Sequence, residues 1–303
     1  MRVGISLRSA YAVDDVRQGA RFMVERTAAA RDAGLDSLFV GDHHNVPVPY
    51  YQNSPILGRL LAEWDERPAG ALYLLPLWHP VIVAEQVCTL SAIASGPFVL
   101  QCAIGAGDEQ FAALGTSTRE RASRFEESLS IVRRLLAGEE VDATNPWTIN
   151  GVRIAPLPPE PVTIWIGGHA PRAIDRAARL GDVWLAGPDL TPEAADQLLG
   201  DYRERCDAHG RAPSAAAIRR DVHVGADDAD AESVAGPVLE SGYRGFDPAA
   251  CVVGGAAPVA AAFRRYAAMG YTDVIVRNIV EDQRAALASI DLLAEVRRLV
   301  LDA

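Results

Sequence analysis

Short apolar segments that alternate with amphipathic helical segments constrain the fold of this chain more than any other feature. We predict strands at residues 2–7, 37–40, 71–77, 98–104, 162–166, 182–186, 219–225 and 272–277, each followed by helical sequence. Strands joined by helices pair in parallel through right-handed crossovers. Eight such units predict a (β/α)8 TIM-type barrel of the α/β class, with a doubly wound open sheet as the alternative.

Three longer segments interrupt this alternation, at about residues 45–69, 139–161 and 227–251. The first contains four prolines, the second is irregular and proline-rich, and the third is acidic and then contains glycine and proline. Proline cannot continue a helix interior, so long segments of this kind favour loops. We predict that all three are insertions in βα loops of a single domain spanning residues 1–303.

The basic residues exclude several kinds of chemistry, because all 29 are arginine and none is lysine. Schiff-base enzymes, pyridoxal-phosphate enzymes and Walker-type phosphate loops all need a lysine amine. Arginine remains for binding anions, as a fixed cation that cannot act as a base at neutral pH. The net charge of −11 also opposes binding to nucleic acid and to anionic membranes.

Cysteine usage predicts a cytoplasmic protein. Cys88, Cys102, Cys206 and Cys251 are scattered and form no C-x-x-C pair, which is typical of reduced thiols. The first residues do not resemble a signal peptide, and the apolar runs are too short and too interrupted to span a bilayer.

Candidate site residues cluster where predicted strands end, because the active site of a parallel barrel lies at the carboxyl ends of its strands. Four clusters meet this condition. They are Asp42, His43 and His44 after the second strand; Gly70, Ala71, Leu72 and Tyr73 with Trp78 and His79 around the third; Gly105, Ala106, Gly107, Asp108 and Glu109 after the fourth; and Gly167, Gly168 and His169 after the fifth.

The histidine pair is the best candidate for acid–base catalysis. Histidine titrates near neutral pH, and the adjacent Asp42 could fix its tautomer. Neighbouring residues of an extended strand point in opposite directions, so we expect only one of His43 and His44 to face the site. A structural role for both remains the alternative. Asp108 and Glu109 either supply a further carboxylate or begin a helix. Without a cluster of three or four ligands, we predict no metal site.

The two glycine turns suit a phosphate-bearing or flat ligand. Gly167 and Gly168 allow close backbone approach, and the N–H groups that follow attract an anion without any lysine. Gly105 to Gly107 could pass beneath a flat ligand, and Trp78 and His79 could wall it. Tight turns and a hydrophobic staple are the alternatives. The turn from Gly105 to Gly107 is not a dinucleotide fingerprint, because a third glycine is missing and the two acidic residues that follow would repel a pyrophosphate.

These segments resemble the bacterial luciferase-like monooxygenase family. The resemblance lies in residues 34–44 (GLDSLFVGDHH), 74–81 (LLPLWHPV), 84–86 (AEQ), 103–107 (AIGAG), 164–168 (IWIGG) and 177–182 (AARLGD). Members of that family are (β/α)8 barrels, often dimeric, that bind reduced flavin mononucleotide (FMN) or the deazaflavin coenzyme F420 (F-420). The resemblance thus implies a homodimer with a cofactor at the barrel mouth.

The same resemblance assigns roles to individual residues. It implies that His43 is the acid–base residue and that Gly167, Gly168 and His169 hold the cofactor phosphate. It implies a non-proline cis peptide bond within residues 70–73, beneath the ring system. Deazaflavin members carry a glutamate directly after the glycine turn, where this chain has Asp108 followed by Glu109.

The expected reaction is monooxygenation of a small organic substrate with reduced FMN and O2, the FMN being supplied by a separate reductase. Hydride transfer from F420 is one alternative, and a non-catalytic flavin-binding barrel is another. We expect the segment 45–69, which contains Tyr50, Tyr51 and Trp64, to cover the mouth. The absence of lysine argues against a sugar-phosphate substrate.

Overall fold

Eight parallel strands close into a barrel in the computed structural model, which describes residues 1–212 and 215–302. The strands, in barrel order, are β1 (Arg2–Leu7), β2 (Leu38–Val40), β3 (Ala69–Leu74), β4 (Phe98–Ala103), β7 (Thr163–Gly167), β8 (Val183–Ala186), β9 (Ala215–Val224) and β11 (Asp273–Asn278). β9 pairs with β8 on one side and with β11 on the other, and β11 pairs with β1. The predicted barrel is therefore confirmed, and the open sheet is excluded.

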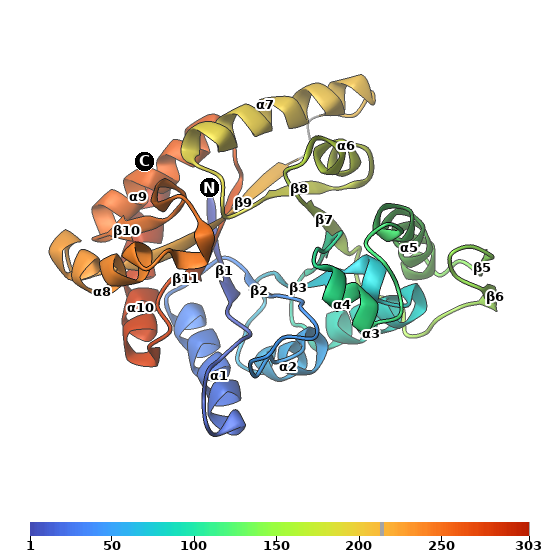
Figure 1. Ribbon diagram of the computed structural model, residues 1–303, viewed down its shortest axis with the longest axis horizontal. Helices are drawn as coiled ribbons and strands as arrows, with labels where there is room; N and C mark the ends of the chain where they lie inside the picture. Colours follow the sequence, from blue (N-terminus) through green and yellow to red (C-terminus); the bar gives the residue numbers. More distant parts are fainter. Residues whose placement is uncertain (213–214, 303) are drawn as a thin grey trace.

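Helices surround the barrel (Figure 1). They are α1 (Val16–Asp32), α2 (Asn53–Leu60), α3 (Pro80–Ile93), α4 (Asp108–Ala113), α5 (Arg121–Leu136), α6 (Pro171–Leu180), α7 (Pro192–Ala208), α8 (Asp228–Glu240), α9 (Ala256–Met269) and α10 (Gln283–Leu301). Side chains of Asp15, Thr191 and Asp282 cap α1, α7 and α10 by accepting backbone N–H groups of the first turn. α3, α6 and α7 begin with proline, whose missing N–H costs nothing there. None of the helices in the described residues has the length and apolar character needed to cross a membrane.

Two predicted strands differ from the structure by more than one residue at an end. The third strand ends at Leu74 rather than at residue 77, and residues Leu75–Leu77 form a short 3-10 helix. Pro76 explains this difference, because it fixes its own backbone angle and cannot donate to a strand ladder. The seventh strand begins at Ala215, where Ala215 to Ala217 pair with β8. Alanine is a weak strand former, so the residues themselves do not indicate this earlier start.

The three predicted insertions contain more regular structure than the sequence indicates. Residues 45–69 include α2, and residues 139–161 include an antiparallel hairpin of β5 (Val141–Ala143) and β6 (Ile149–Val152). This hairpin lies between α5 and β7, so the prediction that the second insertion belongs to a βα loop is wrong. Residues 227–251 form α8 and two 3-10 turns, Tyr243–Gly245 and Pro248–Ala250. They lead into β10 (Val252–Gly254), which pairs in parallel with β9. The third segment is thus an additional helix and strand at the edge of the barrel.

The barrel interior changes from apolar to polar along the strands. Its amino-terminal part is filled by one buried cluster, which consists of Phe39, Val99, Trp165, Val183, Ala217 and Ile275. Two residues further along their strands lie Gln101, Arg219 and Arg277, on the same inward face because side chains alternate along a strand. The apolar cluster therefore forms a floor beneath a polar carboxyl-terminal mouth.

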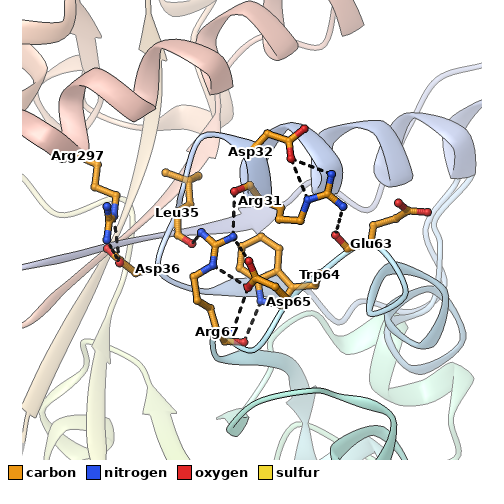
Figure 2. Close-up of polar contacts among 9 residues, drawn as sticks. All are labelled: Arg31, Asp32, Leu35, Asp36, Glu63, Trp64, Asp65, Arg67 and Arg297. Atoms are coloured by element: carbon orange, nitrogen blue, oxygen red, sulfur yellow. Dashed lines mark hydrogen bonds and ion pairs between the residues drawn. The ribbon is translucent and has the colours of Figure 1, made fainter.

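A network of arginine hydrogen bonds fastens the opposite, amino-terminal end (Figure 2). Arg67 donates to the carbonyl oxygens of Leu35 and Arg31 at 2.6 and 2.9 Å, and its guanidinium lies 4.8 Å from the ring centre of Trp64. Arg297 donates twice to Asp36, at 2.7 and 3.0 Å. Trp64 therefore stabilises the base of the barrel, and the prediction that it covers the mouth is wrong.

Candidate functional site at the barrel mouth

A cavity of about 310 Å³ opens at the carboxyl ends of the strands. Its walls come from β1, β2, β3, β9 and β11 and from the segments that follow them. The residues that line it include Leu7, His43, Tyr50, Leu72, Arg219, Arg244 and Arg277. A larger hollow of about 540 Å³ lies between α5 and residues 158–164, near the amino-terminal ends of β7 and β8. Of these two hollows, the mouth cavity has the position at which barrel active sites are built.

His43 lines this cavity, whereas His44 is turned away from it. The ring of His44 packs 5.3 Å from the ring of Trp78, and its Nε2 lies 3.2 Å from Oδ1 of Asp42. The structure therefore separates the two histidines as strand alternation predicts. Burial lowers the pKa of His43 below its ordinary value, the nearby His44 adds to this effect, and the charge of Asp42 opposes it.

Asp42 is a positioning residue beneath His43. Its side chain is buried, and Oδ2 accepts hydrogen bonds from the backbone N–H of Leu74 and from Nε1 of Trp78, both at 2.8 Å. These bonds tie the end of β2 to the end of β3 and to the segment before α3. Trp78 is thereby held in place by a polar contact rather than by a hydrophobic staple alone.

Asp108 and Glu109 form the first turn of α4 and are exposed, outside the wall of the mouth cavity. The helix dipole favours acidic side chains in the first turn of a helix. Asp108 and Glu109 therefore begin a helix, as the alternative prediction for them states. The preceding turn has positive φ angles at Gly105 (74°) and Gly107 (87°), a conformation that favours glycine. Arg121 holds this turn by donating to the carbonyl oxygen of Gly105 at 3.2 Å.

In the third-strand segment, only Leu72 reaches the cavity. Gly70 and Ala71 are buried in the barrel wall, and the Tyr73 hydroxyl lies 2.8 Å from Oγ of Ser54 on α2. In the described residues the cis peptide bonds are those before Pro146 and Pro156. The prediction of a non-proline cis bond within residues 70–73 is therefore wrong.

The turn after β7 leaves several backbone donors free. Gly168 has a φ of 141°, and its carbonyl oxygen accepts a hydrogen bond from Nε1 of Trp184 at 2.8 Å. The N–H groups of His169, Ala170 and Arg172 donate to no acceptor within the described residues. The His169 side chain is exposed and lies 3.9 Å from Asp189. Free N–H groups at the start of α6 can bind an anion.

Sequence reasoning missed the charged residues on the far wall of the cavity. Arg219 lies on β9, Arg277 on β11 and Arg244 on the 3-10 turn Tyr243–Gly245, and Asp221 of β9 lies among them. Parallel barrel strands usually read as continuous apolar runs. The charged residues inside β9 and β11 were therefore the signal from which this part of the site could have been predicted. No group of three or more His, Cys, Asp or Glu is arranged to hold a metal in the part of the chain that the structure describes.

Comparison with known proteins agrees with this architecture. The family described as luciferase-like monooxygenase matches residues 1–270. The chain therefore belongs to this family. This match confirms the predicted family resemblance.

Two sequence relatives are F420-dependent glucose-6-phosphate dehydrogenases. The protein from Beutenbergia cavernae is 30% identical over 220 residues, which cover 66% of this chain and 64% of the relative. The protein from Nakamurella multipartita is 27% identical over 220 residues, covering 68% and 63%. The match thus spans less than two thirds of the length of these relatives.

Two solved structures have the same fold. Monooxygenase RslO1 from Streptomyces bottropensis has a TM-score of 0.86 at 20% identity, covering 97% of this chain and 98% of that one. The oxygenating constituent of 3,6-diketocamphane monooxygenase from Pseudomonas putida, in complex with FMN, has a TM-score of 0.81 at 16% identity, covering 98% of each chain. At these identities the likeness establishes the fold.

Proposed function

We propose that this enzyme binds a reduced flavin or deazaflavin at the barrel mouth and uses it to transform a small organic molecule. The observation that carries this proposal is the position of His43 in the mouth cavity, with its pKa lowered by burial. A neutral imidazole at pH 7 can accept a proton from a bound substrate. Asp42 below it fixes the end of β2, so that His43 keeps its place.

The residues present fit such a cofactor. The free N–H groups of His169, Ala170 and Arg172 suit a phosphate, and no lysine is needed. A Cβ atom placed on Gly107 would have no neighbour within 4 Å, so the glycine turn after β4 leaves open space beside the mouth. When bound, the cofactor would supply reducing equivalents, while the chain positions substrate and moves protons.

For the reaction itself we propose monooxygenation with reduced FMN and O2, one atom of O2 entering the substrate and the other leaving as water. The match to a family described as monooxygenases, over residues 1–270, supports this mode. A separate reductase would supply reduced FMN. A homodimer, as implied by the family resemblance, remains a further prediction.

Hydride transfer with F420 is the second candidate, and two observations favour it. Curated relatives that match this chain are F420-dependent dehydrogenases. In addition, the mouth cavity is lined by three arginines, whereas an oxygen-activating site is expected to be apolar and dry. In this mode the neutral His43 would accept the hydroxyl proton of an alcohol substrate.

A comparison of the two cofactors tests both candidates. Fluorescence titrations of the purified protein with reduced FMN and with reduced F420 under anaerobic conditions give two dissociation constants. Monooxygenation predicts tighter binding of FMN and a changed rate of reoxidation by O2 relative to free reduced FMN. Tighter binding of F420, with no effect on FMN reoxidation, would replace the first candidate by the second.

The role of His43 needs a separate measurement with a matched control. His43→Gln should abolish turnover of any substrate found while leaving cofactor affinity within about threefold, a difference under 1 kcal/mol. His44→Gln, which changes the neighbouring histidine outside the cavity, should retain turnover. Equal losses in both variants would contradict the assignment.

A further inference from the structure

Arg277 is a cation without a hydrogen-bonding partner on the wall of the mouth cavity. Within the described residues its guanidinium makes no hydrogen bond and no ion pair, and its Nε is shielded from solvent. Burial and the nearby Arg219 lower the pKa of Arg277 to about 10, although Asp221 opposes them. Arg277 is half-buried, and withdrawing a charge from water is costly unless it is paired, so an arginine in this position indicates a partner that the chain itself does not provide.

Asp221 is not that partner, because it pairs with other side chains and makes no ion pair with Arg277. Oδ1 lies 3.3 Å from Nε of Arg219, and Oδ2 accepts from Nη1 of Arg244 at 2.8 Å and from the hydroxyl of Tyr243 at 2.9 Å. Its side chain is fully buried between these donors. Nη2 of Arg219 is also buried without a hydrogen bond. Two guanidinium groups of the cavity therefore keep unused donors.

The backbone at Arg244 is strained in a way that serves this cluster. Its φ of 51° lies in the left-handed region, which is uncommon for residues other than glycine. The conformation directs Arg244 to Asp221 and the cavity, with its guanidinium 4.6 Å from the ring centre of Phe246. Strain of this kind is retained mainly at functional sites.

The charge of the cavity selects the kind of ligand. Arg219, Arg244 and Arg277 face Asp221 and Asp42, which leaves one net positive charge when His43 is neutral. Asp42 is committed to the N–H groups of Leu74 and Trp78. A ligand with a single negative charge would balance the cavity, whereas a phosphate dianion would exceed it. The planar fork of a guanidinium matches a carboxylate.

We propose that the substrate is a small organic carboxylate whose carboxylate group is bound by Arg277 and Arg219. This inference rests on the proposed function, since it places the substrate in the same cavity as His43. Leu7 and Leu72 offer apolar contacts to the rest of the molecule. The volume of about 310 Å³ limits it to a compact compound.

Calorimetric titration of the purified protein with benzoate, benzamide and phenyl phosphate tests the ligand class. Benzoate should bind at least tenfold more tightly than its uncharged isostere benzamide and than the dianionic phosphate. Arg277→Gln should weaken benzoate binding by about tenfold or more, as expected for a charge-assisted hydrogen bond. Arg153→Gln, at an exposed arginine directly after β6, should leave it unchanged. Equal binding of benzoate and benzamide, or tighter binding of phenyl phosphate, would overturn the proposal.

A cofactor titration separates this inference from the proposed function. Arg277→Gln should keep the wild-type affinity for FMN and F420, whereas a tenfold loss would mean that these arginines hold the cofactor instead. If neither cofactor binds the wild-type protein, the proposed function fails while the benzoate result still decides the ligand class. Arg219→Gln provides a second variant, expected to weaken benzoate binding in the same direction, and an unchanged affinity there would contradict the two-arginine site.

Discussion

Nε1 of Trp78 donates a hydrogen bond to Oδ2 of Asp42 at 2.8 Å, and this contact joins the second and third βα units of the barrel. The same oxygen accepts the backbone N–H of Leu74, also at 2.8 Å. Because the Asp42 side chain is fully buried, both donors would lose their partner if the carboxylate were removed. The residue that precedes the candidate acid–base histidine thus has a structural role.

We expect Asp42→Ala to lower the free energy of unfolding by about 2–4 kcal/mol, because leaving each buried donor unpaired costs about 1–3 kcal/mol. Asp108→Ala is the matched control, since Asp108 is exposed at the start of α4 and should change stability by less than about 1 kcal/mol. Urea denaturation followed by circular dichroism measures both. Similar small losses in the two variants would show that Asp42 does not hold the mouth together.

The titration of His43 provides a prediction about pH. The ordinary pKa of histidine is about 6.5, and burial lowers that of His43, so the side chain should be mainly neutral at pH 7 and become protonated at lower pH than an exposed histidine. Above this lowered pKa, His43 should be fully able to accept a proton. As the pH falls through the pKa, the side chain becomes protonated and this ability is lost. Proton NMR of the histidine ring signals, assigned by comparison with His43→Gln, measures the midpoint.

Two neighbours affect this pKa in opposite directions, which provides an internal check. Asp42→Asn removes a negative charge and should lower the pKa of His43 further, whereas His44→Gln removes a repelling neighbour and should raise it. Shifts with the same sign in both variants would contradict this electrostatic account.

The order of strands could be predicted because each strand is a short apolar run between helical segments, a pattern that is local in sequence. The placement of His43 followed from equally local geometry, since adjacent residues of a strand point in opposite directions. The closure of β9 onto β8 involves alanines with little strand propensity, so the start of β9 could not be read from the residues.

The arginine cluster was missed for a different reason. Arg219, Arg244 and Arg277 are distant in sequence, and they meet only because β9 and β11 are adjacent in the closed barrel. Arg244 also depends on a left-handed backbone angle, which residue type does not predict. Trp64 shows the converse error, because an aromatic residue in a long loop proved to pack beside Arg67 at the opposite end.

Gly70 is expected to be essential for packing between strands rather than for cofactor binding. A Cβ atom at this position would lie 2.1 Å from the carbonyl oxygen of Val99 on β4, and that backbone is fixed by the barrel ladder. Gly70→Ala should therefore destabilise the protein by about 2 kcal/mol or more, within the range of overpacking. Gly200→Ala, in the middle of α7 with open space around it, should instead stabilise by up to about 1 kcal/mol. Thermal unfolding of both variants, compared with the wild type, would contradict this account if the two changes had the same sign.

Two arginines of the same barrel, the buried Arg220 and the half-buried Arg277, should respond oppositely to the same substitution. Nη1 of Arg220 donates to the carbonyl oxygens of Pro188, Leu190 and Ala250 at 3.1, 2.7 and 3.1 Å, so Arg220→Gln should lower the free energy of unfolding by about 3 kcal/mol or more. Arg277 has no such acceptors within the described residues.

Arg277→Gln should accordingly raise the free energy of unfolding by about 1 kcal/mol or more, because it removes an unpaired and partly desolvated charge. Denaturation curves recorded in the absence of any carboxylate buffer measure this difference. Adding benzoate should then stabilise the wild type and not the variant, since a ligand stabilises only a protein that binds it. A destabilised Arg277→Gln variant would mean that the charge is already compensated within the fold, and that the cavity does not await an anion.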